Sequence, residues 1–177
     1  FVPGTGTVTF VLGAGTQTVD CGGLPFNHVE HSGAGTLQLT ADISVGGNLT
    51  QSGGTFDADA QLVAVTGNVG ISSGTFTASS ATTSLQGNWS MTGGVFAHNG
   101  GTVTFNGAAG QTLGGGGATF NNLNNAGAGT VALTVSDTSV AGTLTVATTF
   151  DVVGRTLTMQ STADFAGAGA LLVGAGG

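Results

Sequence analysis

Three consecutive units of 20 residues, GNLTQSGGTFDADAQLVAVT (47–66), GNVGISSGTFTASSATTSLQ (67–86) and GNWSMTGGVFAHNGGTVTFN (87–106), align without a gap. Each unit opens on Gly-Asn, has an apolar residue third and a phenylalanine tenth, and ends in an alternating segment. A unit this short cannot bury its apolar face alone, so the fixed period predicts stacked units that share one core. We expect two or three strands of about four to six residues per unit, with turns at the glycine pairs.

Stacking places chemically similar side chains over one another, which predicts the core. The predicted core columns comprise Leu49, Val69, Trp89, Phe56, Phe76, Phe96, Val63, Val65, Leu85, Val103 and Phe105. The matching positions elsewhere are Phe10, Phe26, Leu37, Leu39, Phe120, Leu123, Val131 and Leu133. We also expect Asn48, Asn68 and Asn88 to stack as an inward or corner amide ladder.

A longer echo is superimposed on the short period, at a spacing of about 95 residues. GTVTF (6–10) returns at 101–105, FNHVEHSGAGTLQLT (26–40) returns as FNNLNNAGAGTVALT (120–134), and ISVGGNLT (43–50) returns as TSVAGTLT (138–145). The sequence therefore predicts an all-β chain, a single β-solenoid over residues 1–177 with coils of about 20 residues. It holds two supra-repeat copies at about 6–100 and 101–177, and about nine coils. A β-sandwich is the competing fold, but it gives no reason for a constant period.

Composition supports this fold class and excludes several functions. The 177 residues include 35 glycines, 40% hydrophobic residues and only 5% charged residues, with Arg155 as the one cation besides the histidines. The low charge argues against amphipathic helices, which need a charged face. The chain has no lysine, which excludes P-loop, Schiff-base and pyridoxal sites. A net charge of −7 argues against nucleic acid and anionic membrane surfaces. No apolar run is long enough for a membrane helix, and the lone Cys21, expected to be a small buried residue, excludes an internal disulfide framework.

The blocks GTVTFNGAAGQTLGGGGATFNNLNNAGAGTVALT (101–134) and GNLTQSGGTF (47–56) resemble the strand repeats of very large bacterial surface and secreted proteins, the β-strand-repeat or autotransporter/adhesin-like proteins. The resemblance covers most of residues 6–160. It implies a β-solenoid on the outside of a bacterial cell that serves as a stalk, adhesin or fibre. The family offers no active site to carry over, and residues 161–177 depart from its pattern.

The ends of the chain, FVPGTGTVTFVL (1–12) and ALLVGAGG (170–177), lack the charged or helical cap of natural solenoids. Open sheet edges pair with other chains. We therefore expect either an excerpt of a longer solenoid or a protomer that adds to itself head to tail into filaments. The predicted assembly ends are Phe1, Val2, Leu171, Leu172 and Val173. Because the chain starts at Phe1 without Met or a signal sequence, we also expect a processed chain or a piece of something longer.

The sequence thus predicts a mechanical role without enzymatic activity or cofactor: a structural subunit or segment of an extracellular bacterial fibre. Its partners would be copies of itself or flanking solenoid repeats, with no nucleic acid and no membrane insertion. The alternative, from a different class, is an adhesin stalk or glycan-binding surface module. An ice-binding or polysaccharide-active β-helix is a weaker alternative, because the threonine pairs do not recur in successive units and the carboxylates are scattered. Those pairs are Thr7/Thr9, Thr16/Thr18, Thr102/Thr104, Thr143/Thr145 and Thr156/Thr158.

Two clusters of residues are candidates for a catalytic or metal-binding site. Gly70-Ile71-Ser72-Ser73-Gly74 matches the G-x-S-x-G nucleophile pattern, but that motif needs a strand–turn–helix context and neighbouring units place glycine-rich turns in these columns. His28, Glu30 and His31 are the densest ionisable cluster and contain transition-metal ligand types. A strand places His28 and Glu30 on one face and His31 on the other. The matched residues Asn122, Asn124 and Asn125 indicate that this segment is a polar outer surface.

Calcium and glycosylation are the remaining candidates. Asp57 and Asp59 alternate, but the next units lack the further carboxylates that calcium requires. Asn48-Leu49-Thr50 and Asn88-Trp89-Ser90 match the N-glycosylation sequon, although we expect a corner role for both asparagines. The many serines and threonines are candidates for O-glycosylation.

Overall fold

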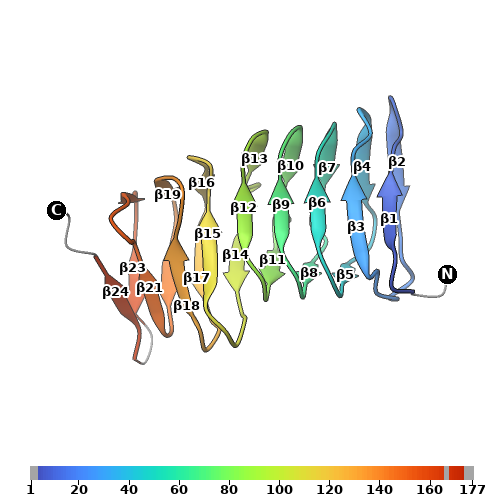
Figure 1. Ribbon diagram of the computed structural model, residues 1–177. Helices are drawn as coiled ribbons and strands as arrows, with labels where there is room; N and C mark the ends of the chain where they lie inside the picture. The colour runs from blue at the N-terminus through green and yellow to red at the C-terminus, as the bar shows by residue number, and fades with distance from the viewer. Residues whose placement is uncertain (1–3, 166–167, 174–177) are drawn as a thin grey trace.

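The computed structural model describes residues 4–165 and 168–173 and is a parallel β-solenoid, which confirms the predicted fold class. The chain passes through three faces in each coil, and strands pair in parallel with strands one coil before and one coil after (Figure 1). The largest sheet has nine strands, so eight turns separate its first rung from its last. At the usual strand separation of about 4.8 Å, the rod is about 40 Å long.

Face 1 is the nine-stranded sheet. Its strands are β1 Thr7–Phe10, β3 His28–His31, β6 Leu49–Gln51, β9 Val69–Ile71, β12 Trp89–Met91, β15 Gln111–Gly114, β18 Thr130–Leu133, β21 Thr149–Asp151 and β24 Ala170–Leu172. Face 2 carries β2 Thr16–Val19, β4 Thr36–Leu39, β7 Thr55–Asp57, β10 Thr75–Thr77 and β13 Val95–Ala97, followed by β16 Thr119–Phe120, β19 Thr138–Val140 and β22 Leu157–Met159. Face 3 carries β5 Ile43–Val45, β8 Val63–Val65, β11 Thr82–Leu85, β14 Thr102–Phe105, β17 Asn122–Asn125, β20 Leu144–Val146 and β23 Ala163–Phe165.

The register follows the sequence period. Val29 pairs with Leu49, Leu49 with Val69, and Val69 with Trp89, each partner 20 positions further on. Trp89 then pairs with Leu113, 24 positions further on, because the corner between β14 and β15 is longer. Face 2 is interrupted in this coil: among the described residues, β13 and β16 belong to separate sheets. We call the boundary between β13 and β16 the seam.

The interior is mostly apolar, as the alternation within each strand predicts, and contains a column of aromatic rings. The rings of Phe56 and Phe76 stack with centroids 4.9 Å apart and planes 9° from parallel, and those of Phe76 and Phe96 lie 6.3 Å apart. Trp89 from face 1 packs edge-on against Phe96 and Phe120 at 5.1 and 5.6 Å. The phenylalanine column continues across the seam, because the centroids of Phe96 and Phe120 are 4.9 Å apart. The interior therefore joins the two halves where the backbone ladder of face 2 does not.

Matching strands of the two supra-repeat copies lie on different faces of the solenoid. TVTF is β1 on face 1 in the first copy and β14 on face 3 in the second. His28–His31 (β3) lies on face 1, whereas its echo Asn122–Asn125 (β17) lies on face 3. The second copy is therefore rotated back by one face relative to the first. Five coils of 20 residues would bring the chain back to the same face after 100 residues. The spacing of about 95 residues is shorter by about one strand, so the sequence is consistent with a shift by one face.

Glycine is required at the corner between faces 1 and 2. Gly54, Gly74 and Gly94 occupy the eighth position of the three aligned units and have φ values of 45°, 71° and 75°. A side chain is strained at such angles. A Cβ on Gly94 would also lie 2.7 Å from the carbonyl oxygen of Gly74 in the coil below. The repeated glycine thus permits corners to stack at strand spacing.

Candidate functional site: rod ends and outer faces

The predicted core residues all lie on inward positions. Leu49, Val69 and Trp89 form one column on face 1, and each is at most 1% exposed. Val65, Leu85 and Phe105 form a second column on face 3. Phe10, in the first coil, is only partly buried, because no coil covers it among the described residues. These residues form the core of the rod, so candidate binding sites must be sought on the outer faces and at the ends.

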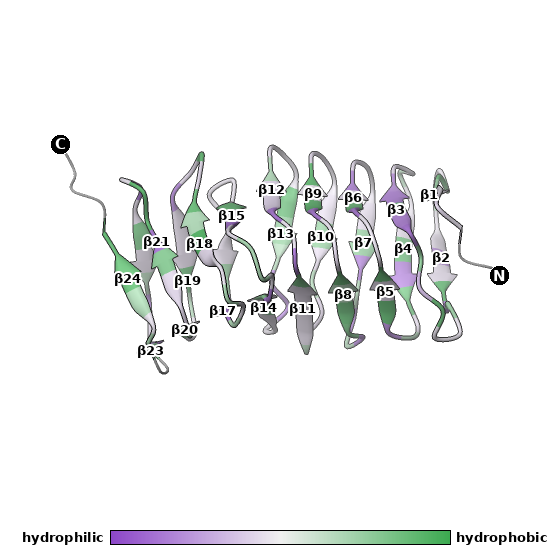
Figure 2. Cartoon of the chain, turned by 60° about the horizontal axis from the view of Figure 1, so that its bottom comes forward, coloured by the Kyte–Doolittle hydropathy of each residue, from purple (hydrophilic) through white to green (hydrophobic). Residues whose placement is uncertain are grey.

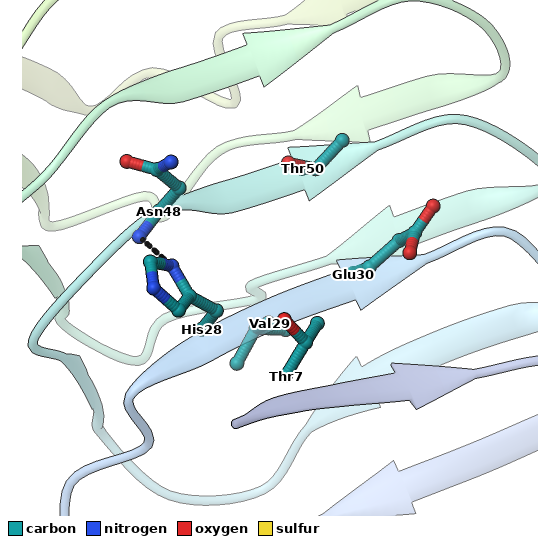
Figure 3. Close-up of a pocket in the computed structure, with 6 residues that line it drawn as sticks. All are labelled: Thr7, His28, Val29, Glu30, Asn48 and Thr50. Carbon is teal, nitrogen blue, oxygen red and sulfur yellow. Dashed lines mark hydrogen bonds between the residues drawn. The ribbon is translucent and has the colours of Figure 1, made fainter. Parts of the chain in front are cut away.

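The asparagine ladder is present at the corner before face 1. Asn48 Oδ1 accepts a hydrogen bond from the backbone N–H of Asn68 at 2.9 Å, and Asn68 Oδ1 accepts one from the N–H of Asn88 at 2.7 Å. Asn88 Oδ1 accepts from the N–H of Thr112 at 2.8 Å. His28 fills the same role one coil earlier, since its Nδ1 accepts from the N–H of Asn48 at 2.8 Å (Figure 3). The side chains of both sequon asparagines, Asn48 and Asn88, are therefore engaged in structure.

The histidine cluster is divided between the outside and the inside of the rod. His28 and Glu30 line a shallow pocket on face 1 with Thr7, Asn48 and Thr50 (Figure 3). Glu30 accepts a 3.4 Å hydrogen bond from the hydroxyl of Ser52. Within the residues described, no group of three or more His, Cys, Asp or Glu side chains is arranged to hold a metal.

His31 corrects the prediction of a polar outer surface. It is 0% exposed, and its Nδ1 lies 3.0 Å from Oε1 of the buried Gln51. Gln51 in turn donates to the carbonyl oxygens of Gly53 and Gly54 at the corner. Asn125, which matches His31 in the second copy, is also buried and donates to the carbonyl oxygen of Thr149 at 2.6 Å. The residue types were misleading because the buried amides of Gln51 and Asn125 donate to backbone carbonyl oxygens and the buried imidazole of His31 contacts the side chain of Gln51.

The remaining chemical candidates are distributed without a shared site. Asp57 Oδ1 accepts from the backbone N–H of Asp59 at 3.0 Å and thereby forms a local turn. Gly70 to Gly74 runs from β9 through a turn into β10, so the context required by a nucleophile elbow is replaced by strand–turn–strand. The threonine pairs fall on all three faces and form no single flat array. Cys21 is partly buried at the first coil, and its thiol donates to the carbonyl oxygen of Asp42 at 3.3 Å.

The two ends of the rod expose apolar side chains. At the C-terminal end Leu172 is 50% exposed and Val173 73%, and Phe165 in the neighbouring strand is 43% exposed. Leu171 is partly buried against the core. Figure 2 shows β24 in the hydrophobic colour at this end. Phe1 and Val2, the other predicted assembly residues, lie outside the described residues.

At the N-terminal end, Val11 and Leu12 are exposed in the first corner and Leu24 follows β2. Val8, Phe10, Val19 and Phe26 line an open recess beside them, which includes the partly buried Cys21. Among the described residues, β1 and β2 have no strand on their outer edges at this end, and β22, β23 and β24 have none at the other. Each end therefore offers unpaired parallel backbone together with apolar side chains.

No family model, curated protein or solved structure matches this chain. Within the part of the chain that the structure describes, no helix has the length and apolar character needed to cross a membrane.

Proposed function

We propose that this chain is a structural segment of an extracellular bacterial fibre, in which solenoid rods stack end to end. The observation that carries the proposal is the pair of end rungs. Unpaired parallel strands are templates for further pairing, and here they occur with Leu172, Val173 and Phe165 exposed at one end and Val11 and Leu12 at the other. A contact between two different ends of one molecule is heterologous and generates an open filament.

The outer faces support a mechanical role over an adhesive one. The outward positions of face 3 form a column of small or polar side chains: Ser44, Ala64, Ser84, Thr104, Asn124 and Thr145. Phe165, the one aromatic residue among the exposed large side chains of the described residues, lies at the end of the rod. Glycan recognition usually combines a concave site with apolar or aromatic groups. Among the described residues, six of the ten exposed large apolar side chains lie at the ends, where a fibre needs them, and the other four, Leu62, Val95, Val135 and Val153, are exposed along the sides of the rod.

Electron microscopy and light scattering of the purified chain test the proposal. A single rod is about 40 Å long, from the strand spacing, so filaments many times this length are expected above a critical concentration. The light-scattering intensity per unit of protein concentration should rise with concentration as filaments form. A chain that shows only short isolated rods at every concentration would contradict the proposed function.

A further inference from the structure

The join between the two supra-repeat copies inside the chain shows how a second copy of the chain can dock. The second copy begins at β14, which pairs with β11 on face 3, and continues with β15, which pairs with β12 on face 1. On face 2, the seam between β13 and β16 is unpaired. The internal join therefore uses two faces and leaves the third open.

The first strands of the chain repeat the strands that make this join. β1 has the sequence TVTF, which is identical to β14. β2 ends in Gln17-Thr18-Val19, and β15 begins Gln111-Thr112-Leu113. Because β14 and β15 occupy faces 3 and 1, the same sequence is compatible with stacking on those faces. In the chain, β1 and β2 occupy faces 1 and 2.

We infer that a second copy of this chain docks with its β1 on β23 and its β2 on β24, so that successive copies are rotated by one face. This inference rests on the proposed function and specifies its contact. β23 and β24 are the last described strands of faces 3 and 1, the two faces used by the internal join. The incoming copy thus repeats the arrangement of β14 on β11 and β15 on β12.

The inward side chains fit this docking. Val8 and Phe10 would continue the columns that contain their echoes Val103 and Phe105. In these columns Ala163 follows Leu144, and Phe165 follows Val146. Val8 of the incoming copy would therefore lie over Ala163, and Phe10 over Phe165. Phe165 is 43% exposed although Val146, one coil below in the same column, is fully buried, so the incoming Phe10 would supply the missing cover.

Face 1 gives an equivalent fit. Leu133 lies in the column of Trp89 and Leu113. Extending the β21–β24 register by one residue pairs Val152 with Val173, in agreement with the 2.9 Å hydrogen bond from the N–H of Val152 to the carbonyl oxygen of Leu172. Val19 of the incoming copy would cover Val173, as Leu113 covers Trp89. Neither β1 nor β2 contains a charged residue, so Asp164 in β23 meets no like charge.

An unrotated stack fits less well. It would place β1 on β24 and β2 over β22, although faces 2 and 3 each end one rung below face 1. The described residues of the two copies would then leave two strand positions unfilled, one on face 2 and one on face 3. In the rotated stack the described residues leave one position unfilled, on face 2, the face whose strands β13 and β16 are not paired at the internal join.

Paired cysteines distinguish the two stacks. In a Cys21→Ser background, the double variant Val8→Cys with Ala163→Cys places thiols opposite each other in the rotated stack. Val8→Cys with Val173→Cys does so in the unrotated stack and is the matched control. Directly opposed strand residues have Cα atoms about 5 Å apart, within disulfide range. Oxidation of preformed filaments, followed by denaturing electrophoresis without reductant, should give a ladder of multimers for the first pair and monomer for the second.

The outcomes separate the contact from the function. Filaments that cross-link through Val173→Cys, or through neither pair, would overturn the rotated contact and leave the proposed fibre standing. If the wild-type chain forms no filaments at any concentration, the proposed function fails and the rotated contact fails with it. Electron microscopy of each variant before oxidation shows whether filaments are present, so a variant that does not assemble is not counted as a negative cross-link.

Discussion

At the scale of single residues, the rod depends on side chains that touch their equivalents in the next coil. Phe76 is stacked on Phe56 at 4.9 Å and lies beside Phe96 and Trp89 at 6.3 and 5.8 Å. It is fully buried. A change at this position therefore affects three coils at once, which distinguishes a solenoid core from the core of a globular domain.

Replacing Phe76 tests the core. We expect Phe76→Ala to lower the free energy of unfolding by about 3–5 kcal/mol, the usual cost of such a cavity. Phe76→Asp should cost more, because an unpaired charge would be buried. Urea denaturation followed by circular dichroism measures both. Val95→Ala, at a side chain 58% exposed on the neighbouring strand, is the control and should change stability by less than about 0.5 kcal/mol. Unchanged stability in Phe76→Asp would contradict the core assignment.

The buried pair His31 and Gln51 gives a second prediction at this scale. In His31→Leu the Oε1 atom of Gln51 loses its 3.0 Å partner inside the core, so we expect a loss of about 1–3 kcal/mol. The double variant His31→Leu with Gln51→Ile copies the next coil, where Ile71 occupies the position of Gln51. It should be more stable than His31→Leu alone.

Thermal unfolding of the wild type, the two single variants and the double variant measures the coupling between His31 and Gln51. Additive losses in this cycle would show that the two side chains do not depend on each other, contrary to the buried hydrogen bond.

At the scale of the repeated element, the Gly-Asn opening has a physical cause. Each asparagine oxygen accepts the backbone N–H one coil later, and the glycine before that N–H lies directly over the asparagine side chain. A Cβ on Gly67 would be 2.5 Å from Asn48 Oδ1, and one on Gly87 would be 2.6 Å from Asn68 Oδ1. Glycine and asparagine therefore recur together because the asparagine side chain of one coil occupies the space that a Cβ would need in the next coil.

Asn68 is the best place to test the ladder, since it lies outside both sequons. Asn68→Ala removes the acceptor for the N–H of Asn88, and we expect a loss of about 0.5–1.5 kcal/mol. Asn68→Asp keeps an acceptor oxygen and should lose less. Chemical denaturation of the two variants side by side measures the difference. Equal losses would show that the hydrogen bond contributes nothing beyond the shape of the side chain.

Some features of the repeated elements could be predicted from the sequence and others could not. Phe56, Phe76 and Phe96 were predictable as a column because equal spacing and equal chemistry leave one stacking register. The burial of His31 was missed: alternation places it on the face opposite His28 and Glu30, but the matched asparagines indicated a polar outer surface, and its partner Gln51 is 20 positions away. Exposed apolar residues at the C-terminal end were expected from the terminal sequence, whereas the face on which each strand lies depends on corner lengths, such as the long corner before β15, that no single residue encodes.

At the scale of the whole molecule, the seam divides an otherwise continuous ladder. Faces 1 and 3 pass through it with paired strands, and the Phe96–Phe120 contact crosses it inside, but among the described residues β13 pairs with β10 alone. The seam lies between the first and second supra-repeat copies. Because the proposed contact between molecules would also leave face 2 open, an open face 2 would recur at every join along a fibre.

Hydrogen exchange tests whether the seam is the weakest part of the ladder. The N–H of Val95 donates to the carbonyl oxygen of Gly74 in the preceding coil. Successive N–H groups of a strand point to opposite sides, so the N–H of Phe96 points to the open edge. Phe76 is the matched control, since it is also a buried phenylalanine, 0% exposed against 9% for Phe96, but lies in β10, between two paired strands. We expect the Phe96 amide to exchange measurably faster than the Phe76 amide, because edge hydrogen-bonding groups open at lower free energy. Exchange followed by NMR of the monomeric rod gives both rates, and equal protection would show that the ladder of face 2 is closed in solution.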